Sequence, residues 1–121
     1  MTRLQQHLLE LGTIWSRRDA SWVADFEATL GSVAAFHDPS CIGPLLGLFE
    51  DEPPSDDLLF SVVHAIEGYP DRVYVAGLLG ATEALLGRTP RWARILYMRI
   101  LNAPTARAEL ASAICHEPES T

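Results

Sequence analysis

The chain has 121 residues, of which 48% are hydrophobic and 21% charged, and its formal net charge is −7 at pH 7. This composition excludes an intrinsically disordered chain, and the length is enough for one domain with a single core. The negative charge argues against nucleic-acid binding, because phosphate recognition normally requires a positive surface. We therefore expect one domain over residues 1–121, with a frayed tail over 116–121.

The sequence also indicates the cellular compartment in which the protein is found. No apolar run approaches the roughly 20 residues that a membrane-spanning helix needs, and the N-terminal residues lack the apolar core of a signal peptide. Cys41 and Cys115 have no metal-ligand spacing, so we expect two small buried residues in a reducing environment. These features predict a cytoplasmic protein without a membrane segment, metal or cofactor.

The first three predicted helices follow from apolar residues that recur every three or four positions. They cover about residues 2–14, 20–36 and 39–48. Asp38 is a good N-cap for the third helix and Pro39 suits its first position. Gly43 and Gly47 weaken this helix, so we expect it to be short.

Residues 50–54 are predicted to form a loop, because consecutive prolines prevent a helix from passing through them. The loop acids Glu50, Asp51 and Glu52 have no basic neighbour in the sequence. Asp56 and Asp57 follow, in the first turn of the next helix, where negative charge favours the helix dipole. The sequence therefore predicts a group of uncompensated carboxylates held by a stiff loop.

This loop lies in an acidic block, since the chain has eleven carboxylates and neither lysine nor arginine between Asp19 and Asp71. Such a block attracts a cationic protein surface and raises the rate of encounter with it. The alternative is a solvated face that only keeps the chain soluble. The predicted partner-binding residues are Glu50, Asp51, Glu52, Asp56, Asp57 and Asp71.

Four further helices complete the predicted fold. Ser55 caps a helix that is apolar nearly all round over residues 58–67, which indicates a central position. The next, over 71–87, carries a stripe of small residues including Gly77 and Gly80, which predicts a close helix crossing. The others cover 90–101 and a last segment ending near 115. The sequence therefore predicts an all-α fold of about seven short antiparallel helices, either a stack of helical hairpins resembling HEAT repeats or a compact bundle.

Few residues suggest catalysis. His64 and Glu67 lie one helical turn apart, and such a pair can do general acid–base work, although it more often orients a buried histidine within the fold. No nucleophile motif or phosphate-binding loop accompanies them. Arg99 lies in an apolar stretch and is a candidate for an internal salt bridge with Glu67 or Asp71. We therefore predict no catalytic residue and no metal ligand.

Five elements of the sequence appear in a recognisable order. They are Asp38–Ile42 (DPSCI), Phe60–Glu67 (FSVVHAIE), Tyr74–Val75 (YV), Pro90–Ala93 (PRWA) and Arg99–Asn102 (RILN). Together they resemble the immunity protein 30 family of bacterial polymorphic toxin systems, over more than half of the chain.

The resemblance implies an all-helical cytoplasmic protein that binds the C-terminal domain of a cognate toxin and neutralises it. Many such toxins are nucleases with basic clefts, which an acidic surface could block. The residues that match the shared elements are implied to maintain the fold: His64, Glu67, Trp92, Arg99 and Asn102. The alternative reading is an all-helical adaptor that binds a basic protein or peptide and has no link to a toxin. Neither reading predicts an oligomeric state.

Overall fold

The computed structural model describes residues 1–116, and this part of the chain is all-α, as predicted. The predicted tail over 116–121 falls on His116, which ends the last helix, and on 117–121, which lie outside the described residues. Within the described part there is no strand. The helices are α1 (Arg3–Arg17), α2 (Trp22–Ala34), the short 3-10 helix η1 (Pro39–Cys41), α3 (Ile42–Leu46), α4 (Asp56–Glu67), α5 (Asp71–Arg88), α6 (Pro90–Leu101) and α7 (Pro104–His116).

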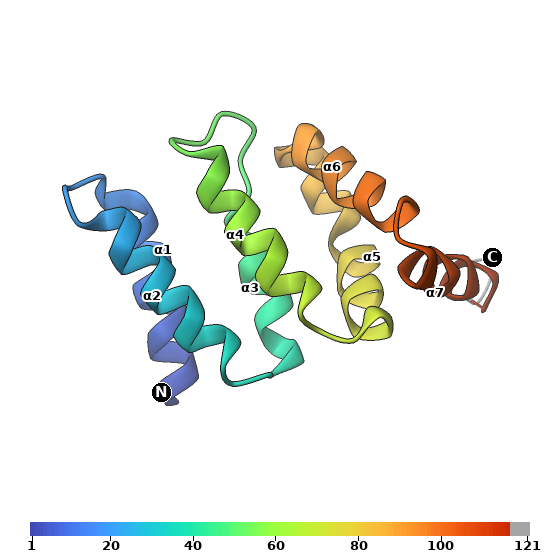
Figure 1. Cartoon of the computed structure of the whole chain (residues 1–121), viewed down its shortest axis with the longest axis horizontal. Coiled ribbons are helices and arrows are strands. Elements are labelled where there is room, and N and C mark those ends of the chain that lie inside the picture. The colour runs from blue at the N-terminus through green and yellow to red at the C-terminus, as the bar shows by residue number, and fades with distance from the viewer. Residues whose placement is uncertain (117–121) are drawn as a thin grey trace.

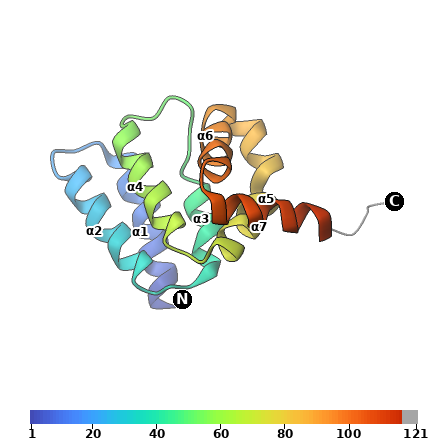
Figure 2. The same cartoon turned by 45° about the vertical axis from the view of Figure 1, so that its right-hand side comes forward.

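The helices form three antiparallel hairpins that stack side by side (Figure 1). One layer holds α1, α3 and α5, and the other holds α2, α4 and α6. The last helix, α7, packs against α5 and α6 and projects away from the stack (Figure 2). Of the two predicted arrangements, the structure therefore has the stack of helical hairpins.

Side chains at the helix starts explain most of the boundaries. Thr2 and Gln5 form a capping box at α1, and the Ser55 hydroxyl accepts a hydrogen bond from the Leu58 amide at 3.3 Å. Asp38 accepts a hydrogen bond from the Ser40 amide at 2.9 Å and so begins η1. The third predicted helix, 39–48, is therefore shorter and divided, with η1 followed by five residues of α-helix.

The central helix α4 supplies much of the core, because Leu59, Val62, Val63 and Ile66 are fully buried. The predicted close helix crossing occurs at Gly77 of α5, where an added Cβ atom would lie 2.7 Å from Ile42 Cγ2. At Gly80 an added Cβ would meet nothing within 4 Å, so this glycine does not serve the crossing.

Two further observations concern the predicted environment. No helix in the described part of the chain combines the length and apolar character needed to cross a bilayer. Cys41 is buried, as predicted, but the prediction was wrong for Cys115, which is exposed. Because α7 is the terminal helix of the stack, one of its faces has no described helix to cover it.

Candidate functional site

The first candidate site lies along one edge of the stack, where the α3–α4 connection of the middle hairpin passes beside the start of α6 (Figure 1). We call residues 50–57 the acidic segment. It contains five of the six predicted partner-binding residues. The contacts of these five carboxylates divide them into two groups with different roles.

Asp51 belongs to the group that holds the structure together. Its Oδ1 atom accepts hydrogen bonds from the Thr89 hydroxyl at 2.7 Å and from the Arg91 backbone amide at 3.1 Å. Thr89 is the N-cap residue of α6, but its own side chain makes no capping hydrogen bond. A carboxylate from a distant loop therefore caps this helix.

Asp56 is paired with Arg91. The Arg91 guanidinium donates two hydrogen bonds to the carboxylate, from Nη1 to Oδ1 at 3.2 Å and from Nη2 to Oδ2 at 2.9 Å. The same Nη1 also donates to the Asp51 carbonyl at 3.0 Å. Hydrogen bonding to Arg91 lowers the pKa of Asp56 below its ordinary value. The prediction of uncompensated carboxylates is therefore wrong for Asp56, because α6 brings the Arg91 guanidinium to it.

Three more contacts fix the connection before Pro53. The Arg88 guanidinium donates to the carbonyls of Leu46 at 3.0 Å and Phe49 at 3.4 Å. On the other side, Trp15 Nε1 donates to Glu50 Oε2 at 3.4 Å. The acidic segment is thus tied to α1 through Glu50 and to the start of α6 through Asp51 and Asp56, and Arg88 of α5 fixes the residues just before it.

Glu52 and Asp57 form the second group. Both are exposed, and neither carboxylate makes a hydrogen bond or ion pair with any residue in the described part of the chain. They flank the two prolines on a segment whose other acids are engaged. These two carboxylates are therefore the ones that remain available to a partner.

Compensation by arginine also occurs at the start of the acidic block. Arg17 forms ion pairs with Asp19 at 2.9 Å and with Asp25 at 2.7 Å. These hydrogen bonds lower the pKa of both carboxyls. The arginines lie outside the block in sequence but beside it in space, so its field is weaker than the count of carboxylates predicts.

The capping role of Asp51 leads to a stability prediction. Asp51→Ala removes the acceptor of the buried Thr89 hydroxyl and of the Arg91 amide, and we expect a loss of about 1–2 kcal/mol in the free energy of unfolding. Glu52→Ala, with no contact to lose, should change it by less than ~0.5 kcal/mol. Denaturant unfolding of both variants is the measurement, and equal midpoints would contradict the capping role.

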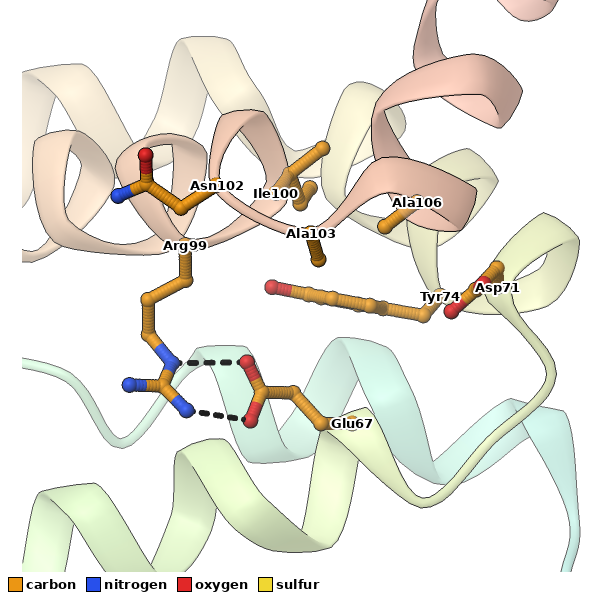
Figure 3. Close-up of a pocket in the computed structure, with 8 residues that line it drawn as sticks. All are labelled: Glu67, Asp71, Tyr74, Arg99, Ile100, Asn102, Ala103 and Ala106. Carbon is orange, nitrogen blue, oxygen red and sulfur yellow. Dashed lines mark hydrogen bonds and ion pairs between the residues drawn. The ribbon is translucent and has the colours of Figure 1, made fainter.

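The sixth predicted partner-binding residue, Asp71, lies elsewhere. It begins α5, beyond the C-terminal end of α4, whereas the acidic segment is at the N-terminal end of α4. There it lines a pocket of about 390 Å³ beside the Glu67–Arg99 ion pair (Figure 3). Arg99 Nε and Nη2 each donate to one Glu67 oxygen at 2.8 Å. This ion pair is one of the two predicted for Arg99.

The remaining residues of the shared elements have different surroundings. Trp92 is fully buried, and its ring centroid lies 5.3 Å from that of Phe49 and 5.0 Å from that of Phe60. Asn102 is exposed at the end of α6. His64 is exposed rather than buried, and with His37 it lines a hollow of about 210 Å³. The prediction of a buried histidine was therefore wrong.

Comparison with known proteins gives one match. The family model described as Immunity protein 30 matches residues 17–110. The chain belongs to this family. No curated protein and no solved structure matches the chain. Membership implies an immunity protein, which acts by binding a toxin, and the match to the Immunity protein 30 family extends beyond the five elements to include α2 and most of α7.

The sequence did not predict the roles of two residues that shape the candidate sites of this family member. Arg91 compensates the acidic segment, and its position inside the PRWA element was the available signal. Tyr74 lines the pocket and lies in the YV element, but nothing in the sequence indicates what surrounds it. In both cases the residue lies within one of the five family elements, but the sequence does not indicate which residues it contacts.

Proposed function

We propose that the chain is an immunity protein that acts in the bacterial cytoplasm and neutralises one toxin of a polymorphic toxin system, contact-dependent or secreted, by binding its C-terminal domain. The observation that carries this proposal is the pair of exposed carboxylates, Glu52 and Asp57, on a segment fastened at several points. Neutralisation by binding requires no catalytic group in the chain.

The chemistry of the acidic segment favours a nuclease as the toxin. A nuclease holds phosphates with lysine and arginine, and carboxylates can take the place of those phosphates. The contacts of Asp51 and Asp56 hold the segment in place, so the backbone at Glu52 and Asp57 loses little conformational freedom on binding. Close charge pairs of this kind couple by ~1.5–7 kcal/mol.

The test is the double variant Glu52→Gln and Asp57→Asn. Neither carboxylate has a hydrogen bond or ion pair within the described chain, and Asp57→Asn removes only a favourable interaction with the α4 dipole, about 0.3–1 kcal/mol. We therefore expect the variant to stay folded and to melt no more than roughly 5 °C below the unaltered protein. We expect its affinity for the toxin to fall roughly tenfold or more, because close interfacial charge pairs are lost. Binding to the purified toxin domain and protection of cells that produce the toxin are the measurements.

A matched control removes the same number of charges elsewhere. Glu27 in α2 and Glu83 in α5 are exposed and make no hydrogen bond or ion pair with other described residues. Glu27→Gln combined with Glu83→Gln should leave affinity within about twofold, because charges outside a contact act mainly on the association rate. If the first double variant stays folded and protects cells fully, the interface lies elsewhere on the molecule.

A further inference from the structure

We propose that the pocket beside the Glu67–Arg99 ion pair receives one basic side chain, arginine or lysine, of the bound toxin. The inference rests on the proposed function and adds a second point of attachment to it. The pocket lies between the end of α4, the start of α5 and the α6–α7 turn, and its volume is about 390 Å³. Its lining residues are those shown in Figure 3.

The charges of the pocket select a cation. Glu67 and Arg99 satisfy each other through two hydrogen bonds of 2.8 Å, so their charges largely cancel. Asp71 is half-buried and has no hydrogen bond or ion pair with any described residue. One carboxylate therefore stays unbalanced in a partly enclosed place, where an ammonium or guanidinium group would be attracted more strongly than at an open surface.

A second observation, independent of the carboxylates, points to a missing ligand. Tyr74 lines the pocket and is only 3% exposed, and its hydroxyl has no hydrogen-bond partner among the described residues. The ring lies across the pocket with the hydroxyl directed toward Arg99 (Figure 3). A buried hydroxyl without a partner is costly, and the N–H groups of a basic side chain are donors that it could accept from.

The shape of the pocket suits a long side chain with a charged end. Ala103 and Ala106 are the smallest residues of the lining and leave room beside the Tyr74 ring. The carbon stem of arginine or lysine can pack on such apolar surface while the charged end remains near polar groups.

The distance between the two candidate sites is compatible with one toxin domain. They lie at opposite ends of α4, whose 12 residues span roughly 18 Å. A standard interface buries about 800 Å² on each partner, which is wide enough to include both ends of such a helix. An anchor residue seated in a pocket is also a common centre of binding energy.

A small-molecule titration tests the pocket without the toxin. Nα-acetyl-L-arginine methylamide and the lysine analogue are added to the isotope-labelled full chain, and amide chemical shifts are followed up to about 50 mM, above a Kd in the millimolar range. We expect shifts at residues around the pocket, from Glu67 to Tyr74 and near Asn102. The neutral isostere Nα-acetyl-L-citrulline methylamide is the control and should bind at least several-fold more weakly.

Asp71→Asn provides the matched variant. It should melt close to the temperature of the unaltered protein and lose most of the response to the basic probes. The absence of shifts with either basic probe, or equal shifts with citrulline, would overturn the proposal. Equal probe binding by the Asp71→Asn variant would also overturn it, because the unbalanced carboxylate would then have no role.

Binding of the toxin domain separates this proposal from the proposed function. We expect Asp71→Asn to weaken binding roughly ten- to a hundredfold, and Glu83→Gln in the same helix to leave it unchanged. If Asp71→Asn binds as tightly as the unaltered chain while neutralising Glu52 and Asp57 weakens binding, the pocket proposal fails and the proposed function stands. If the unaltered chain binds no toxin domain, the proposed function fails as well, and the pocket loses its assigned occupant.

Discussion

Replacing Trp92 by alanine should lower the free energy of unfolding by about 3–5 kcal/mol, a large part of the stability of a domain of this size. Trp92 is fully buried against the rings of Phe49 and Phe60, so the substitution leaves a cavity bordered by the α3–α4 connection and by α4. Thermal and denaturant unfolding measure the loss.

The consequences reach the acidic segment as well as the core. The Arg91 guanidinium lies over the Trp92 ring, 5.2 Å from its centroid, and the same residue holds Asp51 and Asp56. Loss of the indole ring therefore removes a support of the segment that we propose as the toxin-binding site. We expect a Trp92→Ala variant to lose protection because it unfolds, and not because the indole contacts the toxin.

Trp92→Phe is the matched variant. The indole Nε1 has no hydrogen-bond partner among the described residues, so phenylalanine removes volume without breaking a hydrogen bond. It should cost clearly less stability than alanine and retain binding. If Trp92→Ala instead melted at the normal temperature and lost toxin binding, Trp92 would be an interface residue, and its assignment to the core would be wrong.

The helices could be predicted because their boundaries depend on neighbouring residues. Thr89 and Pro90 mark the start of α6, and the predicted range of 90–101 is the one observed. The third helix is shorter than predicted, since Gly43 and Gly47 lie within the predicted range of 39–48 and weaken it. Only residues 42–46 are α-helical there, and a 3-10 turn precedes them.

Contacts between distant residues were harder to predict. Arg99 was a candidate for an internal ion pair because it lies in an apolar stretch. This local pattern indicates that Arg99 needs a partner, but the partner, Glu67, lies 32 positions away. The contact between Asp56 and Arg91 joins residues 35 positions apart, and no local pattern specifies it. A count of charge along the sequence therefore overestimated how many carboxylates are uncompensated.

The position of His64 shows a similar limit. The apolar residues of α4 suggested burial on all sides, yet one stripe of the helix contains Asp57, Ser61, His64 and Gly68. The stack covers the other sides of α4, through α2, α3 and α5. Which stripe remains uncovered depends on the order in which hairpins stack, and this order is a property of the whole chain.

Association with the toxin should depend strongly on salt, which is the second large effect we expect. The Debye length falls from ~30 Å at 0.01 M salt to ~10 Å at 0.1 M, so long-range attraction between an acidic chain and a basic toxin is progressively screened. Between these concentrations we expect the association rate constant to fall about tenfold or more, with a smaller change in the dissociation rate constant. Surface plasmon resonance or stopped-flow fluorescence would measure both.

The ion pairs within the fold determine which carboxylates set this salt dependence. Asp56 lies beside Arg91, and Asp19 and Asp25 share Arg17, so two arginines reduce the charge of these three carboxylates from −3 to −1. Glu52 and Asp57 have no such neighbour in the described structure and should contribute most. Neutralising these two carboxylates should reduce the salt dependence of the association rate constant more than the control variant, Glu27→Gln with Glu83→Gln, does. Both double variants change the net charge equally. If the association rate constant of the unaltered chain does not change with salt, charge does not steer the encounter. If both double variants reduce the salt dependence equally, steering depends on the net charge and not on the acidic segment.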